Sequence, residues 1–207
     1  MALNCYCIYG NKQNGKDTFA NYLVEAVKGN LLTCGRVEVV RAAFADPVKE
    51  VAVHLLGMPR DVAWGSQEQR LSWRRIDRNA RQWLQWIGTE LGRQQIHQNL
   101  WVRRMADRVR EGAHCDPPKL FVISDGRFKN ELQDFQEYIN PDVRLISIKI
   151  ERPLFAADDD SHPSEAELRS IPRTDFCNMV INDGSLEDLR QVAEKILNKY
   201  GVESDVT

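Results

Sequence analysis

Short apolar runs alternate with longer amphipathic stretches along most of the chain. Each run is rich in residues that favour strands, and it is followed by a segment whose apolar residues recur every three or four positions, which is the spacing of a helix. The runs that predict strands are residues 5–9, 36–44, 119–125, 143–151 and 179–182. Because strands that alternate with helices usually pair in parallel, the pattern predicts an α/β fold with a mostly parallel five-stranded sheet flanked by helices.

The intervening segments carry the helical pattern, except for three polar stretches. The expected helices begin at residue 19 and cover residues 48–56, 79–96, 101–109, 128–138 and 185–200. Residues 58–78 are irregular, with tryptophans and arginines interleaved, and fit either a solvated surface excursion or a substrate-binding insert. Residues 154–175 are charged and lack a core pattern, which is typical of a lid. Residues 202–207 are expected to be a frayed tail.

The first expected strand runs directly into a glycine-rich segment, Gly10 to Lys16, with the spacing GxxxxGK. Glycines at these places let backbone amides turn inward around a phosphate, and the helix that follows adds its positive N-terminal end. Lys16 would then reach the β- and γ-phosphates of a nucleotide. Since the segment lies between an apolar run and an amphipathic one, it predicts a P-loop NTPase fold, in which Gly10, Gly15 and Lys16 bind ATP.

This loop differs from the usual pattern at its last position. Asp17 stands where a Ser or Thr hydroxyl normally ligates Mg²⁺, and Thr18 follows it. We therefore expect the metal contact to come from Thr18, from Asp17 or from elsewhere in the chain.

Charged side chains follow two of the expected strands, where ligands of open α/β sheets bind. Asp46 and Lys49 come after the second strand; Asp46 could cap the next helix, or both residues could lie near a second substrate. Asp125 ends the third strand, where an acid can hold Mg²⁺ or its water shell. Arg127 follows it and is well placed to bind a phosphoryl group as a planar fork.

The expected helix at residues 79–96 carries two further signals. Arg81, Gln85 and Thr89 are spaced by fours and form a polar stripe, which is usually the solvated side of a helix. Gly88 interrupts the helix at a cost of about 1 kcal/mol, which suggests that another group approaches its backbone closely.

Composition sets modest limits. The 207 residues carry a formal net charge of −2, and 43% are hydrophobic, which fits one medium-sized domain without a generally basic surface for polymeric nucleic acid. The five cysteines are scattered without zinc spacing and indicate reduced thiols in a cytoplasmic protein. Neither a secretion signal nor a membrane-spanning run is indicated.

Several segments together resemble one family, the phage-type deoxynucleoside monophosphate kinases, a group of P-loop kinases. The segments, in chain order, are G-N-K-Q-N-G-K-D-T, A-D-P-V-K, L-Q-W-I-G-T-E-L, L-W-V, S-D-G-R-F-K-N-E, I-E-R-P, H-P-S-E and I-N-D-G-S-L. Specificity rests mainly on the G-T-E segment with Trp101 and on the segment around Asp125 and Arg127.

The resemblance implies transfer of the ATP γ-phosphoryl group to a deoxynucleoside monophosphate (dNMP), with Mg²⁺. It implies one kinase domain, with a core at residues 1–57 and 113–207, a helical substrate-binding insert at about 58–112, a lid at about 153–175, and a homodimer. The residues it assigns to ATP are Asn14, Gly15, Lys16, Asp17 and Thr18. Those it places around the monophosphate are Lys12, Lys49, Arg81, Gln85, Gly88, Thr89, Trp101, Asp125, Arg127 and Glu131, to which the strand-end argument adds Asp46. The catalytic set is Lys16, Asp125, Arg127 and Arg152.

Two other readings stay open. Another small-molecule kinase, related to dephospho-coenzyme A kinase or phosphomevalonate kinase, would share the loop but bind no nucleobase. A P-loop ATPase or switch would hydrolyse nucleotide without an acceptor, although the chain lacks the NKxD tetrapeptide of a GTPase on a late strand. The accepted bases, the choice between ribose and deoxyribose, and the roles of Arg70, His162, Arg169 and Arg173 are not readable from the sequence.

Overall fold

The computed structural model describes residues 2–30, 36–153 and 163–204 of the chain. Its contacts divide the chain into two compact units, which we call the sheet unit (Met1–Ala43 with Ala106–Thr207) and the helical unit (Phe44–Met105). Each is described by itself.

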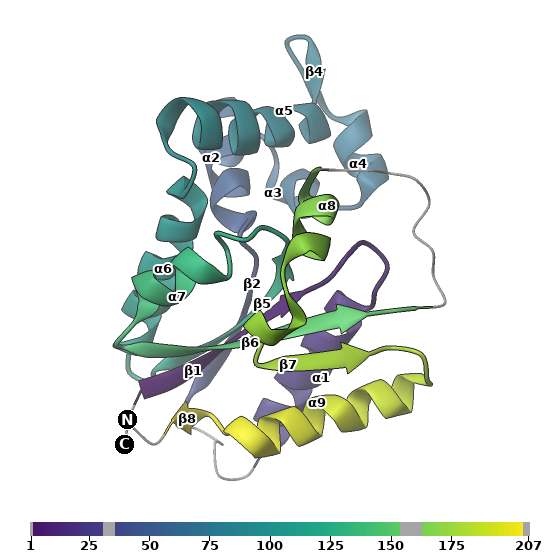
Figure 1. Ribbon diagram of the computed structural model, residues 1–207. Helices are drawn as coiled ribbons and strands as arrows, with labels where there is room; N and C mark the ends of the chain where they lie inside the picture. Colours follow the sequence, from purple (N-terminus) through teal and green to yellow (C-terminus); the bar gives the residue numbers. More distant parts are fainter. Residues whose placement is uncertain (1, 31–35, 154–162, 205–207) are drawn as a thin grey trace. The chain divides into compact units, whose positions relative to one another are not determined.

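The sheet unit is built on parallel strands in the order β2-β5-β1-β6-β7, with the short β8 antiparallel to β1 (Figure 1). The strands are β1 (Ala2–Tyr9), β2 (Glu38–Ala42), β5 (Lys119–Gly126), β6 (Val143–Glu151), β7 (Asn178–Ile181) and β8 (Glu203–Ser204). The prediction of a five-stranded, mostly parallel sheet is confirmed. β1 lies between β5 and β6, which places the loop that follows β1 at the carboxyl edge of the sheet, where ligands of such folds bind.

Helices cover both faces of this sheet because its strands are apolar on both sides. Tyr6 and Ile8 of β1 pack in one cluster with Phe19 and Leu23 of α1 and with Ala193 of α9. α1 and α9 lie side by side in Figure 1. The helices of the unit are α1 (Lys16–Gly29), α7 (Gln133–Ile139), α8 (Pro163–Ser170), the short 3₁₀ turn η2 (Arg173–Asp175), α9 (Leu186–Tyr200) and the last part of α6 (Leu100–Ala113).

The helical unit packs around a separate apolar cluster that includes Val48, Ala52, Ile87 and Trp101. Its elements are α2 (Asp46–Leu56), α3 (Arg60–Ala63), α4 (Gln67–Ser72), β3 (Arg74–Arg75), β4 (Arg78–Asn79), α5 (Ala80–Trp86), the π-helical η1 (Ile87–Ile96) and the first part of α6. Residues 58–78, expected to be irregular, thus form two short helices and a small hairpin. The capping box of Ser66 and Gln69 orders α4, a signal that the expectation overlooked.

The helix predicted at residues 79–96 exists but differs in form. Asn79 precedes it as the N-cap, and the π-helical turns start at Ile87. The close approach expected at the Gly88 backbone is found, since Trp101 Nε1 donates to the Gly88 carbonyl at 2.8 Å. The same indole also approaches Gly92, where a Cβ would lie 2.5 Å from the ring, whereas a Cβ on Gly88 would make an ordinary 3.6 Å contact with Val48. The indole of Trp101 takes the space that a side chain at Gly92 would fill.

Three end positions also differ from the prediction. Asp46 is the first residue of α2 rather than its cap, and the cap residue Ala45 makes no side-chain hydrogen bond. α7 begins at Gln133 instead of residue 128, because the residues before it form a turn held by Glu131. The tail begins ordered, since Val202 is buried and its carbonyl accepts from the Asn4 amide.

Candidate active site

The loop after β1 has the backbone geometry that its glycines predict. Gly15 is the N-cap of α1 with φ +90°, a conformation that only glycine adopts easily. A Cβ on Gly10 would lie 2.7 Å from the Ile150 carbonyl oxygen, so the loop also needs glycine there for close packing. Because Gly15 has no side chain, the N-cap makes no side-chain hydrogen bond to the first turn of α1, and the N-terminal end of such a helix is a place where anions bind.

Lys16 turns back across this loop. Its side chain is 7% exposed, and its Nζ donates to the Asn11 carbonyl at 2.7 Å. An ammonium group held at the loop carbonyls is positioned to exchange such a bond for a phosphate oxygen.

Two asparagines fix the loop to neighbouring strands. Asn14 Nδ2 donates to the Ile150 carbonyl at 3.0 Å, which joins the loop to β6. Asn182, just after β7, donates from its Nδ2 to the Asn14 carbonyl at 3.0 Å and from its backbone amide to the Glu151 carbonyl at 2.8 Å. The loop is thus held from two strands before any ligand binds, which lowers the ordering cost of binding.

Asp17, at the unusual position of the loop, already has partners. Its Oδ1 accepts from the Arg41 guanidinium, which reaches across from β2, and from the Ser124 hydroxyl of β5 at 3.3 Å. Thr18 follows in the same first turn of α1, and a carboxylate with a hydroxyl is a donor set that suits Mg²⁺.

The carboxyl end of β5 is shaped by Tyr9 and Glu131. The Tyr9 ring lies against Gly126, where a Cβ would be 2.5 Å from the ring, and its hydroxyl donates to the Glu131 carbonyl at 2.6 Å. Burial raises the pKa of Tyr9 well above its usual value, so the phenol stays neutral and remains a donor. The Glu131 carboxylate is buried and accepts from the backbone amides of Arg127 at 2.8 Å and Phe128 at 3.1 Å. This turn fixes the backbone position of Arg127, two residues after Asp125.

A pocket in the sheet unit joins the loop to the predicted lid region. Gly10, Asn11 and Asn14 line it together with Arg152, Arg169 and Arg173. Glu151 is paired with Arg173 and, at 3.5 Å, with the buried ammonium of Lys149. Three arginines beside the loop make this pocket suited to a polyanion.

Within the helical unit, the structure brings together some of the predicted residues. Asp46 Oδ1 accepts from Trp64 Nε1 at 3.0 Å and from Lys49 Nζ at 3.4 Å, and the Lys49 ammonium lies 5.3 Å from the centroid of the Trp64 ring. Trp101 is buried and donates from Nε1 to the Gly88 carbonyl at 2.8 Å.

The other predicted side chains of the helical unit lie nearer to solvent. Arg81, Gln85 and Thr89 are exposed. In the sheet unit Lys12 is likewise exposed at the loop. The charged run Asp158 to Asp160 and His162 lie outside the described residues.

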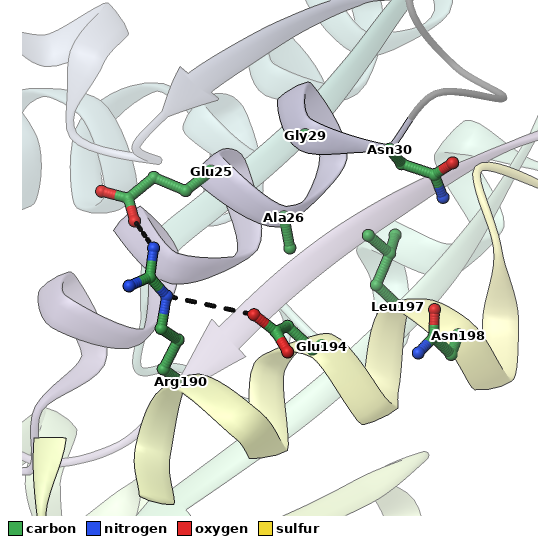
Figure 2. Close-up of a pocket in the computed structure, with 8 residues that line it drawn as sticks. All are labelled: Glu25, Ala26, Gly29, Asn30, Arg190, Glu194, Leu197 and Asn198. Carbon is green, nitrogen blue, oxygen red and sulfur yellow. Dashed lines mark hydrogen bonds and ion pairs between the residues drawn. The ribbon is translucent and has the colours of Figure 1, made fainter. Parts of the chain in front are cut away.

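In the described part of the chain, no three His, Cys, Asp or Glu side chains cluster as a ready metal site, and no helix there is long and apolar enough to cross a membrane. A second pocket, between α1 and α9, is lined by an ion-pair chain in which Arg190 joins Glu25 and Glu194 (Figure 2). It contains none of the predicted site residues.

Sequence reasoning missed four residues that shape the loop and the β5 end: Tyr9, Arg41, Ser124 and Asn182. Ser124 and Asn182 stand at the carboxyl ends of strands. Had the order of the strands been known, both residues could have been placed near the loop. Arg41 lies on an expected strand as its one charged residue near the carboxyl end. Tyr9 gave no polar signal, because an aromatic residue at the end of an apolar strand is usually core.

Comparisons with known proteins give one consistent result. A family model described as deoxynucleotide monophosphate kinase matches residues 66–193. A putative deoxynucleotide monophosphate kinase of Acanthamoeba polyphaga mimivirus is 32% identical over 192 residues, which cover 87% of this chain and 89% of the relative. The deoxynucleoside-5'-monophosphate kinase of Escherichia phage T5 is 34% identical over 90 residues, which cover 42% of this chain and 34% of the relative. The crystal structure of APE1195 matches 98% of this chain and 99% of that chain with a TM-score of 0.50 at 13% identity, a likeness of fold alone.

Proposed function

Because this chain belongs to the deoxynucleotide monophosphate kinase family, we propose how its residues divide the transfer of a phosphoryl group from ATP to a dNMP. The chain is an ATP-dependent kinase whose substrates are nucleotides, and the family match favours this reading over the other small-molecule kinases and over an ATPase. The observation that carries the proposal is the loop from Gly10 to Lys16, with Gly15 in the left-handed conformation and Lys16 folded onto the Asn11 carbonyl.

ATP is bound by the sheet unit. Its β- and γ-phosphates lie in the loop of Gly10, Asn14, Gly15 and Lys16, at the N-terminal end of α1. The close packing of the loop against β6 and Asn182 supports this, because a preformed cradle holds the phosphates in line for attack without further ordering.

Mg²⁺ accompanies ATP, and the residues that would hold it are Thr18 and Asp17. Asp125, in the same unit, would hold the ion or its water shell. The ion supplies charge neutralisation for the transferred phosphoryl group when it is bound. Asp17 is held by Arg41 and Ser124 in the structure, which keeps a carboxylate oriented in the first turn of α1.

Transfer needs positioning and charge, and the chain needs no nucleophile of its own. Lys16, Arg127 and Arg152 supply the positive charge that balances the phosphoryl oxygens, and Asp125 orients the acceptor or the metal's water shell. Arg127 is supported by the Glu131 turn, which fixes its backbone amide, and Arg152 by its place in the pocket beside the loop.

The monophosphate is recognised by the residues that the family resemblance assigns to it. Asp125, Arg127 and Glu131 are in the sheet unit, with Lys12 at the loop. The members of the helical unit are Asp46, Lys49, Arg81, Gln85, Gly88, Thr89 and Trp101. The product is the deoxynucleoside diphosphate, a precursor for DNA synthesis. The enzyme works as a homodimer in the cytoplasm, where the free thiols of Cys5, Cys7, Cys115 and Cys177 fit a reducing compartment.

The test is an ADP-release assay with ATP and Mg²⁺ against dGMP, dTMP, dCMP, dAMP and their ribonucleotide counterparts. Lys16→Ala and Arg127→Ala are the inactivated variants, and Arg144→Ala, which changes an exposed arginine of β6, is the matched control. ADP release that depends on a deoxynucleotide, is lost in both inactivated variants and persists in the control supports the proposal.

The remaining outcomes separate the alternatives. ADP release that needs no acceptor would indicate an ATPase or a switch. No ADP release with any nucleotide of the panel would indicate a kinase for another small molecule. Either outcome would overturn the proposed substrate.

A further inference from the structure

The negative charge of Asp17 is unfavourable for a nucleotide bound at the loop unless a positive group of the sheet unit balances it. This carboxylate lies in the first turn of the helix whose amides would receive the phosphates of ATP. Two like charges so close together repel each other, and the repulsion is strong at the edge of a protein, where solvent screens it less than in bulk water. A hydroxyl at this position, as in the usual loop, would carry no such charge.

The guanidinium of Arg41 is the group that balances the charge of Asp17. Arg41 lies on β2 and pairs in register with Val122 of β5. The strand β5 separates β2 from β1, the strand that leads into the loop. One terminal nitrogen of the guanidinium bonds Asp17 Oδ1 and lies 3.4 Å from the Ser124 hydroxyl, while the other bonds Asn21 Oδ1, one turn further along α1. A planar fork that spans two successive turns of α1 holds the carboxylate in one place.

The Ser124 hydroxyl completes the arrangement. Ser124 is 6% exposed, and it donates to the same Asp17 oxygen at 3.3 Å. Asp17 is thereby held from β2 and from β5, the strand that carries Asp125 at its carboxyl end.

Stability alone does not account for this arrangement. The Asp17 side chain is 80% exposed and that of Arg41 37%, and pairs so exposed contribute little to folding. Their position at the phosphate loop gives the pair a different use.

We propose that Arg41 is a positioning residue for ATP, which neutralises Asp17 and holds it against Ser124, so that a phosphate loop with a carboxylate in the hydroxyl position accepts a polyanionic nucleotide. The inference rests on the proposed function, since it requires nucleotide phosphates at this loop. It concerns ATP and ADP binding alone and predicts no change in recognition of the dNMP.

The test is calorimetric titration of the full chain with ADP, once in EDTA and once with Mg²⁺. Removal of the counter-charge in Arg41→Ala should weaken ADP binding in EDTA about three- to tenfold. The loss should be smaller with Mg²⁺, because the cation itself balances Asp17. Arg41→Lys, which keeps the charge, should recover most of the affinity, and Arg144→Ala should bind as the wild type does.

The double variant Asp17→Asn with Arg41→Ala decides the cause. With the carboxylate neutral, loss of Arg41 should no longer matter, so the double variant should bind ADP in EDTA within about twofold of Asp17→Asn alone. Circular dichroism of each variant checks that the fold is kept.

Two results would overturn the inference: Arg41→Ala binding ADP as tightly as the wild type in EDTA, or loss of Arg41 weakening ADP binding as much in the Asp17→Asn background as in the wild type. Failure of the wild type itself to bind ADP would overturn the proposed function together with this inference. Loss of binding in Lys16→Ala with no change in Arg41→Ala would leave the proposed function standing and refute the role of Arg41 alone.

Discussion

The contact between Gly92 and Trp101 allows a quantitative test of how the helical unit is built. A methyl group at Gly92 would lie 2.5 Å from Cζ2 and 2.6 Å from Nε1 of the Trp101 indole. The ring is rigid and buried, and its Nε1 donates to the Gly88 carbonyl, so it cannot move away without loss of that bond. We expect Gly92→Ala to destabilise the helical unit.

The magnitude follows from opposing terms. Overpacking in a core costs about 1–3 kcal/mol, and weakening of the indole hydrogen bond adds about 1 kcal/mol. Alanine gains about 1 kcal/mol over glycine in a helix. The net loss is therefore about 1–3 kcal/mol, which lowers the midpoint of thermal unfolding by about 2–4 °C for each kcal/mol in a chain of this size.

Gly88→Ala is the matched control, four residues earlier in the same segment. Its Cβ would make an ordinary 3.6 Å contact with Val48, so the helix gain is kept and we expect a midpoint that is unchanged or raised. Intrinsic fluorescence is the assay, because all five tryptophans of the chain lie in the helical unit. Equal midpoints for the two variants would refute the reasoning, since only one of the two new methyl groups meets the indole.

Three further results are expected. Ser185→Ala should lower the unfolding midpoint at pH 7 by about 2–4 °C, because it removes a capping bond worth about 1 kcal/mol at the start of α9. The Ser185 hydroxyl also donates to the Asp188 carboxylate and helps hold the pKa of Asp188 below its ordinary value, so the difference should be largest above about pH 4 and should shrink, without vanishing, as the pH falls through the lowered pKa; a difference that grows in acid would contradict this. Burial raises the pKa of the Cys7 thiol, while Cys177 is exposed. Mass spectrometry after a short alkylation at pH 8 should therefore find Cys177 modified and Cys7 protected until denaturant is added. Rapid labelling of Cys7 in the folded chain would argue against its place in the core. Lys16→Ala should reduce kcat/KM by at least about a hundredfold through loss of a charge at the transferred group, with unchanged circular dichroism, and a variant with near normal turnover would remove Lys16 from the catalytic set.

The strands of the sheet could be predicted because each contains a run of apolar residues. β6 was expected at residues 143–151 and is found there, since most of its residues are buried and it is preceded and followed by prolines. The phosphate loop was equally readable, because Gly10 and Gly15 are required by local geometry: one by close packing against Ile150, the other by its positive φ.

The features that the sequence did not reveal depend on contacts between distant segments. Nothing near Gly92 in the chain indicates that the Trp101 ring will lie against it, so only the approach to the Gly88 backbone was expected. The bond from Arg41 to Asp17 joins residues on different elements, and its existence follows only once β2 is placed beside β5. A local contact was missed as well: the early part of the expected helix at residues 128–138 is a turn, in which the Glu131 carboxylate accepts from the nearby backbone amides of Arg127 and Phe128.

In the proposed reaction the γ-phosphoryl group of ATP passes to a deoxynucleotide. Incubation of the enzyme with ATP labelled at the γ-phosphoryl group and with a dNMP, followed by separation of the nucleotides, tests this transfer most directly. We expect label in the deoxynucleoside diphosphate, in a one-to-one ratio with the ADP formed, and none of it in the Lys16→Ala reaction. Label that appears as inorganic phosphate, with the dNMP unchanged, would contradict it.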